Sequence, residues 1–234
     1  MDQKFNPLGY SDPGPGPGVS GPSPSSGWER YKFVVQNHFW KLIKVNLLFV
    51  LFSLPVFTLP GSMAGMTSVL MCLVRDGNTL MWQDFWREFK ADFPRRIIVF
   101  FFLAFFPSGA AYLLRRAGAS TAASALSSLL SAFIYVIESY WYPMIVKLDI
   151  SVWNALRNAA LLVPIEWKSS LVLFGIGLLF GAFSVWLYPW SLPILLLGAF
   201  SFAQLASCVI GNDAINRRIL PKGKADGAGD GEKV

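Results

Sequence analysis

Long apolar runs separated by short polar and basic segments dominate the chain. They contain few charged side chains and cover residues 39–54, 61–74, 97–114, 121–146, 169–187 and 190–210. A helix needs roughly 20 residues, at about 1.5 Å each, to cross a bilayer. The pattern therefore predicts an all-α fold, namely a polytopic transmembrane helical bundle of about six spans with amphipathic cytoplasmic helices between its hairpins.

Prolines and glycines interrupt the apolar stretch between the first two runs. The segment reads FSLPVFTLPGSMAGM, from residue 52 to residue 66. Proline has no backbone N–H to donate, and glycine lets another backbone approach closely. We therefore predict a hairpin turn that faces the outside and is formed by Pro55, Pro60 and Gly61. Both runs are short for a complete crossing, so the alternative is a re-entrant pair that enters and leaves the membrane on one side.

The basic residues fall mainly on one side of the predicted bundle. Six spans place the basic residues before the first run, in loops 75–96 and 147–168 and after the last run on the same side, with Arg115 and Arg116 opposite. The positive-inside rule then predicts a multi-pass protein of the bacterial cytoplasmic (inner) membrane with both termini in the cytoplasm. The net charge of +6 is spread over several loops rather than forming one stripe, so no nucleic-acid partner is expected.

Two polar tails flank the apolar part of the chain. Residues 1–28 are rich in Pro, Gly and Ser, and residues 221–234 read KGKADGAGDGEKV after Pro221. Such segments have too few apolar side chains to form a core. We predict that 1–28 and 221–234 are disordered cytoplasmic tails on either side of a helical domain, residues 29–220.

A short pattern follows each predicted hairpin: it begins near an Asp and closes with a Pro. In the first two copies it predicts amphipathic helices over residues 79–93 and 151–163, with Thr79 and Ser151 as N-caps. Aromatic side chains share one face of the first helix, which favours contact with the inner leaflet or with a partner. The predicted contact residues are Trp82, Phe85, Trp86, Phe89 and Trp153.

Polar residues recur every three or four positions along the fourth run. A carboxylate within a span is costly and suggests function; Glu138 lies near mid-bilayer if the span ends at residue 146, or close to the interface if YWYP forms the aromatic belt. Serines on the same face also suit close helix packing. The intramembrane polar candidates, two of them from the first hairpin, are Glu138, Tyr135, Tyr142, Ser131, Asn46 and Thr58.

Residues suited to catalysis are scarce. His38 is the only histidine, Cys72 and Cys208 lack metal-ligand spacing, and neither a P-loop nor a dinucleotide fingerprint occurs. We expect a protein that is not an enzyme and that has no catalytic residue, metal or cofactor.

Two quoted motifs resemble the YesL-like family of small bacterial membrane proteins. Its Leu-Pro-x-x-Thr reads LPVFT at residues 54–58, and its aromatic F-x-x-F segment reads FWREF at residues 85–89. The resemblance covers about residues 39–162, while the Pro/Gly-rich start departs from the family pattern. It implies a protein without a recognised catalytic residue that often accompanies carbohydrate importers of the ATP-binding-cassette (ABC) type.

These expectations lead to two alternatives. The first is a non-enzymatic accessory or assembly subunit associated with oligosaccharide uptake, whose partners are the lipid bilayer and the permease and ATPase subunits of an ABC importer. The second is a small transporter or channel that uses the polar stripe of the fourth run.

Overall fold

The structure is a computed structural model that describes residues 27–77, 79–116, 118, 121–148, 150–186 and 198–219. All regular elements in these residues are helical, so the predicted all-α class is confirmed. The predicted tails lie outside the described residues, except residues 27 and 28. The elements are α1 (Gly27–Ser53), η1 (Val56–Thr58), α2 (Leu59–Asp76), α3 (Met81–Lys90), α4 (Phe93–Arg116), α5 (Thr121–Leu148), α6 (Val152–Ile165), α7 (Trp167–Trp186) and α9 (Phe200–Arg218).

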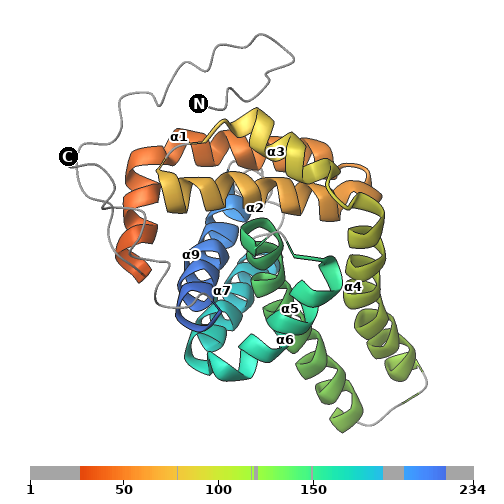
Figure 1. Ribbon diagram of the computed structural model, residues 1–234. Coiled ribbons are helices and arrows are strands. Elements are labelled where there is room, and N and C mark those ends of the chain that lie inside the picture. Colours follow the sequence, from red (N-terminus) through yellow and green to blue (C-terminus); the bar gives the residue numbers. More distant parts are fainter. Residues whose placement is uncertain are drawn as a thin grey trace, which may run out of the picture.

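The first six α-helices repeat one arrangement of three. In each set two helices form a hairpin, and a shorter third helix packs against the second (Figure 1). The α6 helix runs back along α5, because the Trp141 indole donates to the Val152 carbonyl at 3.2 Å while Val163 lies beside Val136. The Asp-to-Pro pattern of the sequence thus has a counterpart in the packing of α3 and α6.

The second helix of each hairpin belongs to the centre of the bundle. The helices α2, α5 and α9 contact one another, and α1, α4 and α7 each contact two of them from outside. In Figure 1, α1, α2 and α3 lie side by side across one end, while α4 and α5 extend away from them. The central helices therefore obtain much of their burial from protein rather than from solvent or lipid.

Two glycines let α3 approach α2 closely. A Cβ atom built on Gly65 would lie 2.9 Å from the Phe85 ring and from its carbonyl oxygen, and one built on Gly61 would lie 2.9 Å from the Phe93 ring and 3.1 Å from the Phe89 carbonyl oxygen. Since residues 61 and 65 meet residues 93 and 85 in reverse order, α3 runs antiparallel to α2. Gly61 therefore serves helix packing, whereas the sequence assigned it to the hairpin turn.

The hairpin turn itself is shorter than predicted. The α1 helix ends at Ser53, and Pro55 precedes η1, so Pro55 lies in the turn as expected. Pro60 and Gly61 already belong to the first turn of α2 and are buried there. The missing donor of Pro60 costs nothing at this position, because the first N–H groups of a helix have no partner within the helix.

The α1 helix is bent at His38, whose backbone is not helical (φ −125°, ψ 25°). Before the bend, α1 is attached to the end of α9: the Gly27 N–H donates to the Asp213 carboxylate at 2.8 Å, and Arg30 lies 3.6 Å from the same carboxylate. Burial and then the charge of Lys41 lower the pKa of the His38 imidazole, and a hydrogen bond with the Gly77 backbone opposes them.

Length and hydropathy support fewer crossings than the sequence pattern predicted. Among the described residues one segment, Val56–Asp76, is long and apolar enough to span a membrane by itself. A second span results if Val152–Ile165 and Trp167–Leu179, bent by 101°, are taken together. Within the first segment, 67% of the residues tested are buried inside the protein, and the core helix of a soluble protein passes the same test. The six predicted spans are thus not confirmed.

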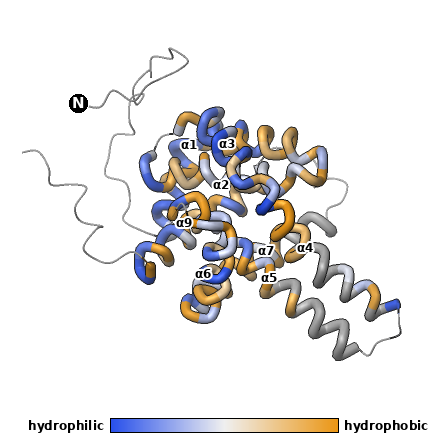
Figure 2. The backbone as a smooth tube through the Cα atoms, turned by 45° about the vertical axis from the view of Figure 1, so that its right-hand side comes forward, coloured by the Kyte–Doolittle hydropathy of each residue, from blue (hydrophilic) through white to orange (hydrophobic). Residues whose placement is uncertain are grey.

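Exposed apolar side chains give a second indication of whether water, lipid or another protein surrounds the helices. Figure 2 shows hydrophobic stretches on the coloured parts of α4 and α5. Large patches of this kind are rare on soluble monomers and mark contacts with membrane or protein. The exposed side chains include Trp40, Leu51, Ile98, Phe102, Leu113, Phe133, Leu171 and Leu179.

We predict that Gly65→Ala destabilises the protein by about 1–3 kcal/mol, the usual range for an overpacked core. The added methyl would collide with Phe85, including its carbonyl oxygen, which cannot move without shifting α3. Thermal unfolding in detergent, followed by tryptophan fluorescence, measures the effect. Gly175→Ala on α7 is the control, since a Cβ there meets nothing within 4 Å. Equal midpoints for the two variants would contradict the packing described here.

Candidate functional site

A buried ion pair joins α3 to the start of α4. The Arg96 side chain is 2% exposed and donates to the Glu88 carbonyl oxygen at 2.7 Å and to the Glu88 carboxylate. An unpaired charge in this position would be very unfavourable, so each partner requires the other. The pair fixes the angle at which the chain leaves α3 and enters α4.

Two of the predicted polar residues lie on α5 near this pair. Tyr142 is fully enclosed, and its hydroxyl lies within electrostatic reach of the Glu138 carboxylate and the Arg96 guanidinium. Glu138 precedes Tyr142 by one helical turn and has one buried carboxylate oxygen. The structure therefore brings Glu138 and Tyr142 together with Arg96, which the sequence analysis did not single out.

Several buried polar atoms around α5 lack a hydrogen-bond partner within the described part of the chain. They include Arg96 Nε, Glu138 Oε1, the Tyr142 hydroxyl and Ser68 Oγ. The first three atoms form the polar cluster of this site, whereas Ser68 belongs to α2. Buried polar groups are nearly always hydrogen-bonded in proteins. This polar cluster could therefore hold water or a small polar ligand by hydrogen bonds.

The other predicted members of the α5 stripe are placed differently. Tyr135 packs against α7, where a Cβ on Gly177 would collide with the tyrosine ring and lie 3.1 Å from its hydroxyl. Tyr135 is 37% exposed and lines a cavity together with residues of α1, α2 and α9. Ser131 belongs to α5, but its side chain lies outside the described residues.

The two predicted candidates from the first hairpin serve helix contacts. The Asn46 side-chain oxygen accepts from the Ser201 N–H at 2.9 Å and so joins α1 to the beginning of α9. The Thr58 hydroxyl lies within hydrogen-bond distance of the carbonyl oxygens of Phe52 and Pro55 and holds the turn. The contacts of Asn46 thus join α1 to α9, and those of Thr58 stabilise the turn.

A second polar group gathers where α2, α5 and α9 end. The Lys147 ammonium donates to the side-chain oxygens of Asn212 and Asn216 on α9. Burial and then the nearby charge of Arg75 lower the pKa of Lys147 to about 8, while the Asp213 carboxylate opposes this shift. These hydrogen bonds tie the end of α5 to α9, and Lys147 and Asn212 each lie close in sequence to an Asp of the repeat pattern.

Some of these polar residues were missed by the sequence analysis. Arg96 was counted only as one of several loop cations, and Gln204, which donates to the Thr67 hydroxyl at 2.8 Å, was not considered. A polar residue within an apolar run was the available signal for Gln204. For Arg96 the signal was weaker, because Arg95 beside it has the same charge and lies on the surface.

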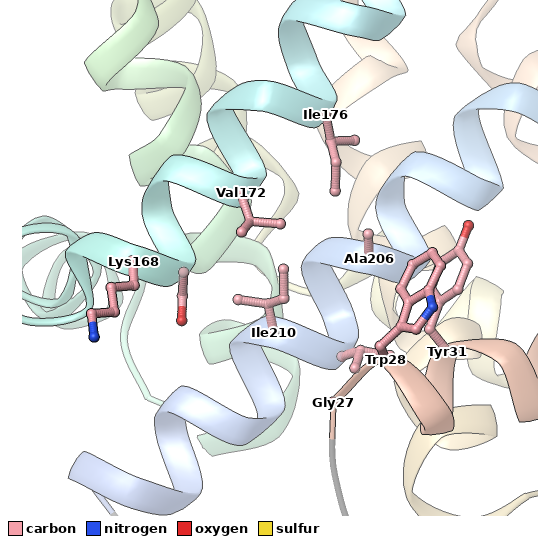
Figure 3. A pocket seen from close by; sticks show the side chains of 10 residues that line it. Gly27, Trp28, Tyr31, Lys168, Val172, Ile176, Ala206 and Ile210 are labelled. Atoms are coloured by element: carbon pink, nitrogen blue, oxygen red, sulfur yellow. The ribbon is translucent and has the colours of Figure 1, made fainter.

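An apolar cleft opens between the beginning of α1 and the helices α7 and α9. Its volume is about 300 Å³. Figure 3 shows Trp28 and Tyr31 on one wall, Val172 and Ile176 on another and Lys168 at one end. The Trp28 and Tyr31 rings stack with centroids 4.8 Å apart. The cleft has a hydrophobic lining with few polar groups, which suits an apolar chain better than a sugar.

A larger cavity of about 520 Å³ lies among α1, α2, α5 and α9. Apolar side chains such as Phe49, Met66 and Phe200 form most of its wall, and Tyr135 and Gln204 contribute polar atoms. No group of three His, Cys, Asp or Glu side chains suited to a metal occurs in the described residues. The described cavities therefore offer binding volume without an evident reactive centre.

The aromatic face of α3 turns inward. Phe85 is 1% exposed and, like Trp86 and Phe89, contacts Phe52 of α1. Trp82, at 56% exposure, is the member of the face that remains largely open. Packing on neighbouring helices, rather than contact with the inner leaflet or with a partner, thus accounts for most of this face.

The α6 helix leaves a comparable surface. Ser151 caps it by accepting from the Asn154 N–H, as predicted, whereas Leu80 rather than Thr79 occupies the N-cap of α3. Trp153 is 61% exposed, and Arg157 is exposed one turn later. Each of the two short helices therefore presents one open tryptophan near its beginning.

Comparison with known proteins adds one partial match. Residues 42–111 match a family described as "Protein of unknown function, DUF624". The matched residues include both motifs of the predicted resemblance, the LPVFT turn and the FWREF segment of α3. Comparisons with curated proteins and with solved structures gave no match. The family description supplies no activity, so function has to be argued from the structure.

We predict that Arg96→Met lowers the free energy of unfolding by about 3–5 kcal/mol, because it leaves the mostly buried Glu88 carboxylate without its partner. Arg95→Met is the matched control: Arg95 is 65% exposed and its pair with Asp92 should contribute at most about 1 kcal/mol. Denaturant unfolding in detergent compares the two variants. Similar losses would show that the Arg96–Glu88 pair has no special role.

Proposed function

We propose that this protein is a non-enzymatic integral membrane protein that acts as an accessory or assembly subunit in carbohydrate uptake by an ABC importer. The observation that carries the proposal is the repeated short helix, α3 and α6, each held rigidly on a hairpin and each with one open tryptophan. Exposed aromatic residues on rigid elements are typical of protein contacts.

Membrane insertion is the first part of this proposal. The exposed apolar side chains on α4, α5 and α7 would be unfavourable in water and suit lipid contact. The basic residues argue for several crossings with both termini in the cytoplasm of a bacterium. The α3 and α6 helices would then lie on the cytoplasmic side.

The choice of partner is the second part, and it has a different basis. The cavities lack a reactive centre in the described residues, which favours a binding role over catalysis. The carbohydrate importer itself is suggested by the YesL-like resemblance, whose motifs fall in α3 and in the α1–α2 turn. Permease or ATPase subunits would contact Trp82 and Trp153, together with the charged side chains beside them.

Affinity purification from native membranes in mild detergent tests the proposal. We expect permease and ATPase subunits to be recovered in fixed ratio, and we expect a double variant, Trp82→Ala with Trp153→Ala, to reduce their recovery about tenfold or more, the loss typical of interface anchors. Trp186→Ala at the far end of α7 is the control and should leave recovery unchanged. Purification of the protein without importer subunits would contradict the accessory role.

The polar cluster on α5 supports a second candidate, a small transporter or channel. Arg96, Glu138 and Tyr142 each have a buried polar atom without a hydrogen-bond partner in the described residues, and Glu138 and Arg96 act electrostatically on Tyr142. Intramembrane carboxylates commonly mark substrate or proton pathways.

For this candidate we predict that flux through reconstituted liposomes falls at least tenfold in Glu138→Gln, because the variant keeps the size of the side chain and removes its charge. The measurement is proton flux, reported by a fluorescent pH indicator inside the liposomes, or the uptake of labelled oligosaccharide. Unchanged flux in Glu138→Gln would remove the reason for assigning a transport path to this cluster.

A further inference from the structure

The α1–α2 turn lies beside the junction of α3 and α4. Gly61, just after the turn, faces the Phe89 backbone and the Phe93 ring, and Phe52, just before it, contacts the Phe89 ring at 5.8 Å between centroids. Phe93 is the first residue of α4. The turn and the α3–α4 junction therefore occupy the same end of the α1–α3 layer.

That junction is strongly polar. Lys90, Asp92 and Arg95 are exposed there, and Asp92 and Arg95 form a pair at 3.3 Å. Arg87 is also exposed, on α3 beside the middle of α2. If α2 crossed the bilayer with its turn outside, α3 would cross beside it and carry these charges through the hydrocarbon. Charged side chains facing lipid are unfavourable there.

The apolar character of α2 does not require a full crossing. Its side chains are almost all buried, and α1, α3, α4, α5 and α9 surround it. A helix that is hydrophobic on all sides is expected wherever protein encloses it. The feature that made α2 resemble a span in sequence is thus explained by its position at the centre of the bundle.

The outward stripe of α1 has the pattern of a helix at a membrane surface. It consists of residues spaced three or four apart, with Trp and Lys at one end and leucines toward the turn: Trp40, Lys44, Leu47 and Leu51 of α1, followed by Leu54 just after the helix, all exposed. Tryptophan and lysine suit the headgroup region, where the lysine charge meets anionic lipid, and the leucines suit the acyl chains.

We propose that the outward face of α1 and the α1–α2 turn insert into one leaflet of the bilayer, from the same side as the α3–α4 junction. The partner of this surface is the lipid of that leaflet, and α4, whose apolar run is one of the predicted spans, leads from this side of the membrane to the other. The inference rests on the membrane location in the proposed function but not on the importer. Because a pair of crossings is removed, both termini remain on the side of α3.

The test determines on which side of the membrane a single cysteine lies in each of three variants. All three variants lack the native cysteines (Cys72→Ser, Cys208→Ala). They are Phe57→Cys in the turn, Lys90→Cys at the α3–α4 junction and Arg116→Cys at the other end of α4. Membrane-impermeant maleimide is applied to right-side-out and inside-out vesicles. We expect Phe57→Cys and Lys90→Cys to react at least tenfold more in one vesicle orientation and Arg116→Cys to react at least tenfold more in the other.

Reaction of Phe57→Cys together with Arg116→Cys, opposite to Lys90→Cys, would overturn the inference. If Phe57→Cys reacts from neither side, a spin label on it decides the leaflet, because a nickel-chelating lipid confined to one leaflet broadens only nearby labels. Broadening from the Lys90 side supports the inference, and broadening from the other side overturns it. Recovery of the protein outside the membrane fraction would overturn both this inference and the membrane part of the proposed function, whereas co-purification tests the importer separately.

Discussion

The close contact between the α2 glycines and the aromatic rings of α3 determines much of the remaining structure. Without a Cβ at Gly61 and Gly65, the α3 backbone can lie directly against α2, and the Phe85 ring fills the space between them. This contact makes α3 run back along α2 instead of away from it. The start of α4 is consequently carried to the α1–α2 turn, and Arg96 is buried where it can meet Glu88.

The central helices depend on polar contacts as well as on apolar packing. Asn46 and Gln204 join α1 and α2 to the first half of α9, while Lys147 and Asp213 join α5 and α1 to its end. Hydrogen bonds of this kind select one rotation and register among the many that apolar surfaces allow. The α9 helix therefore connects the first and second repeats into one bundle.

This architecture separates two possible working surfaces. The polar cluster around Glu138 lies inside the bundle, where its unpartnered atoms suit a small ligand or a path for protons. Trp82 and Trp153 lie outside on the short helices, where they are available to another protein. The accessory role uses the outer surface and needs no chemistry inside, whereas the transport alternative requires the inner cluster to change its occupancy.

The sequence by itself determined the helical class, the order of long and short helices and the break near Pro55, because apolar periodicity, proline and glycine act locally. It also indicated Ser151 as a cap and Glu138 as an unusual buried carboxylate. Only the tertiary structure decided that Gly61 serves packing, that Arg96 rather than Arg95 is buried, and that the α1–α2 turn lies beside the α3–α4 junction. Hydropathy reports how apolar a segment is, but whether protein or lipid surrounds it depends on contacts between residues far apart in the chain.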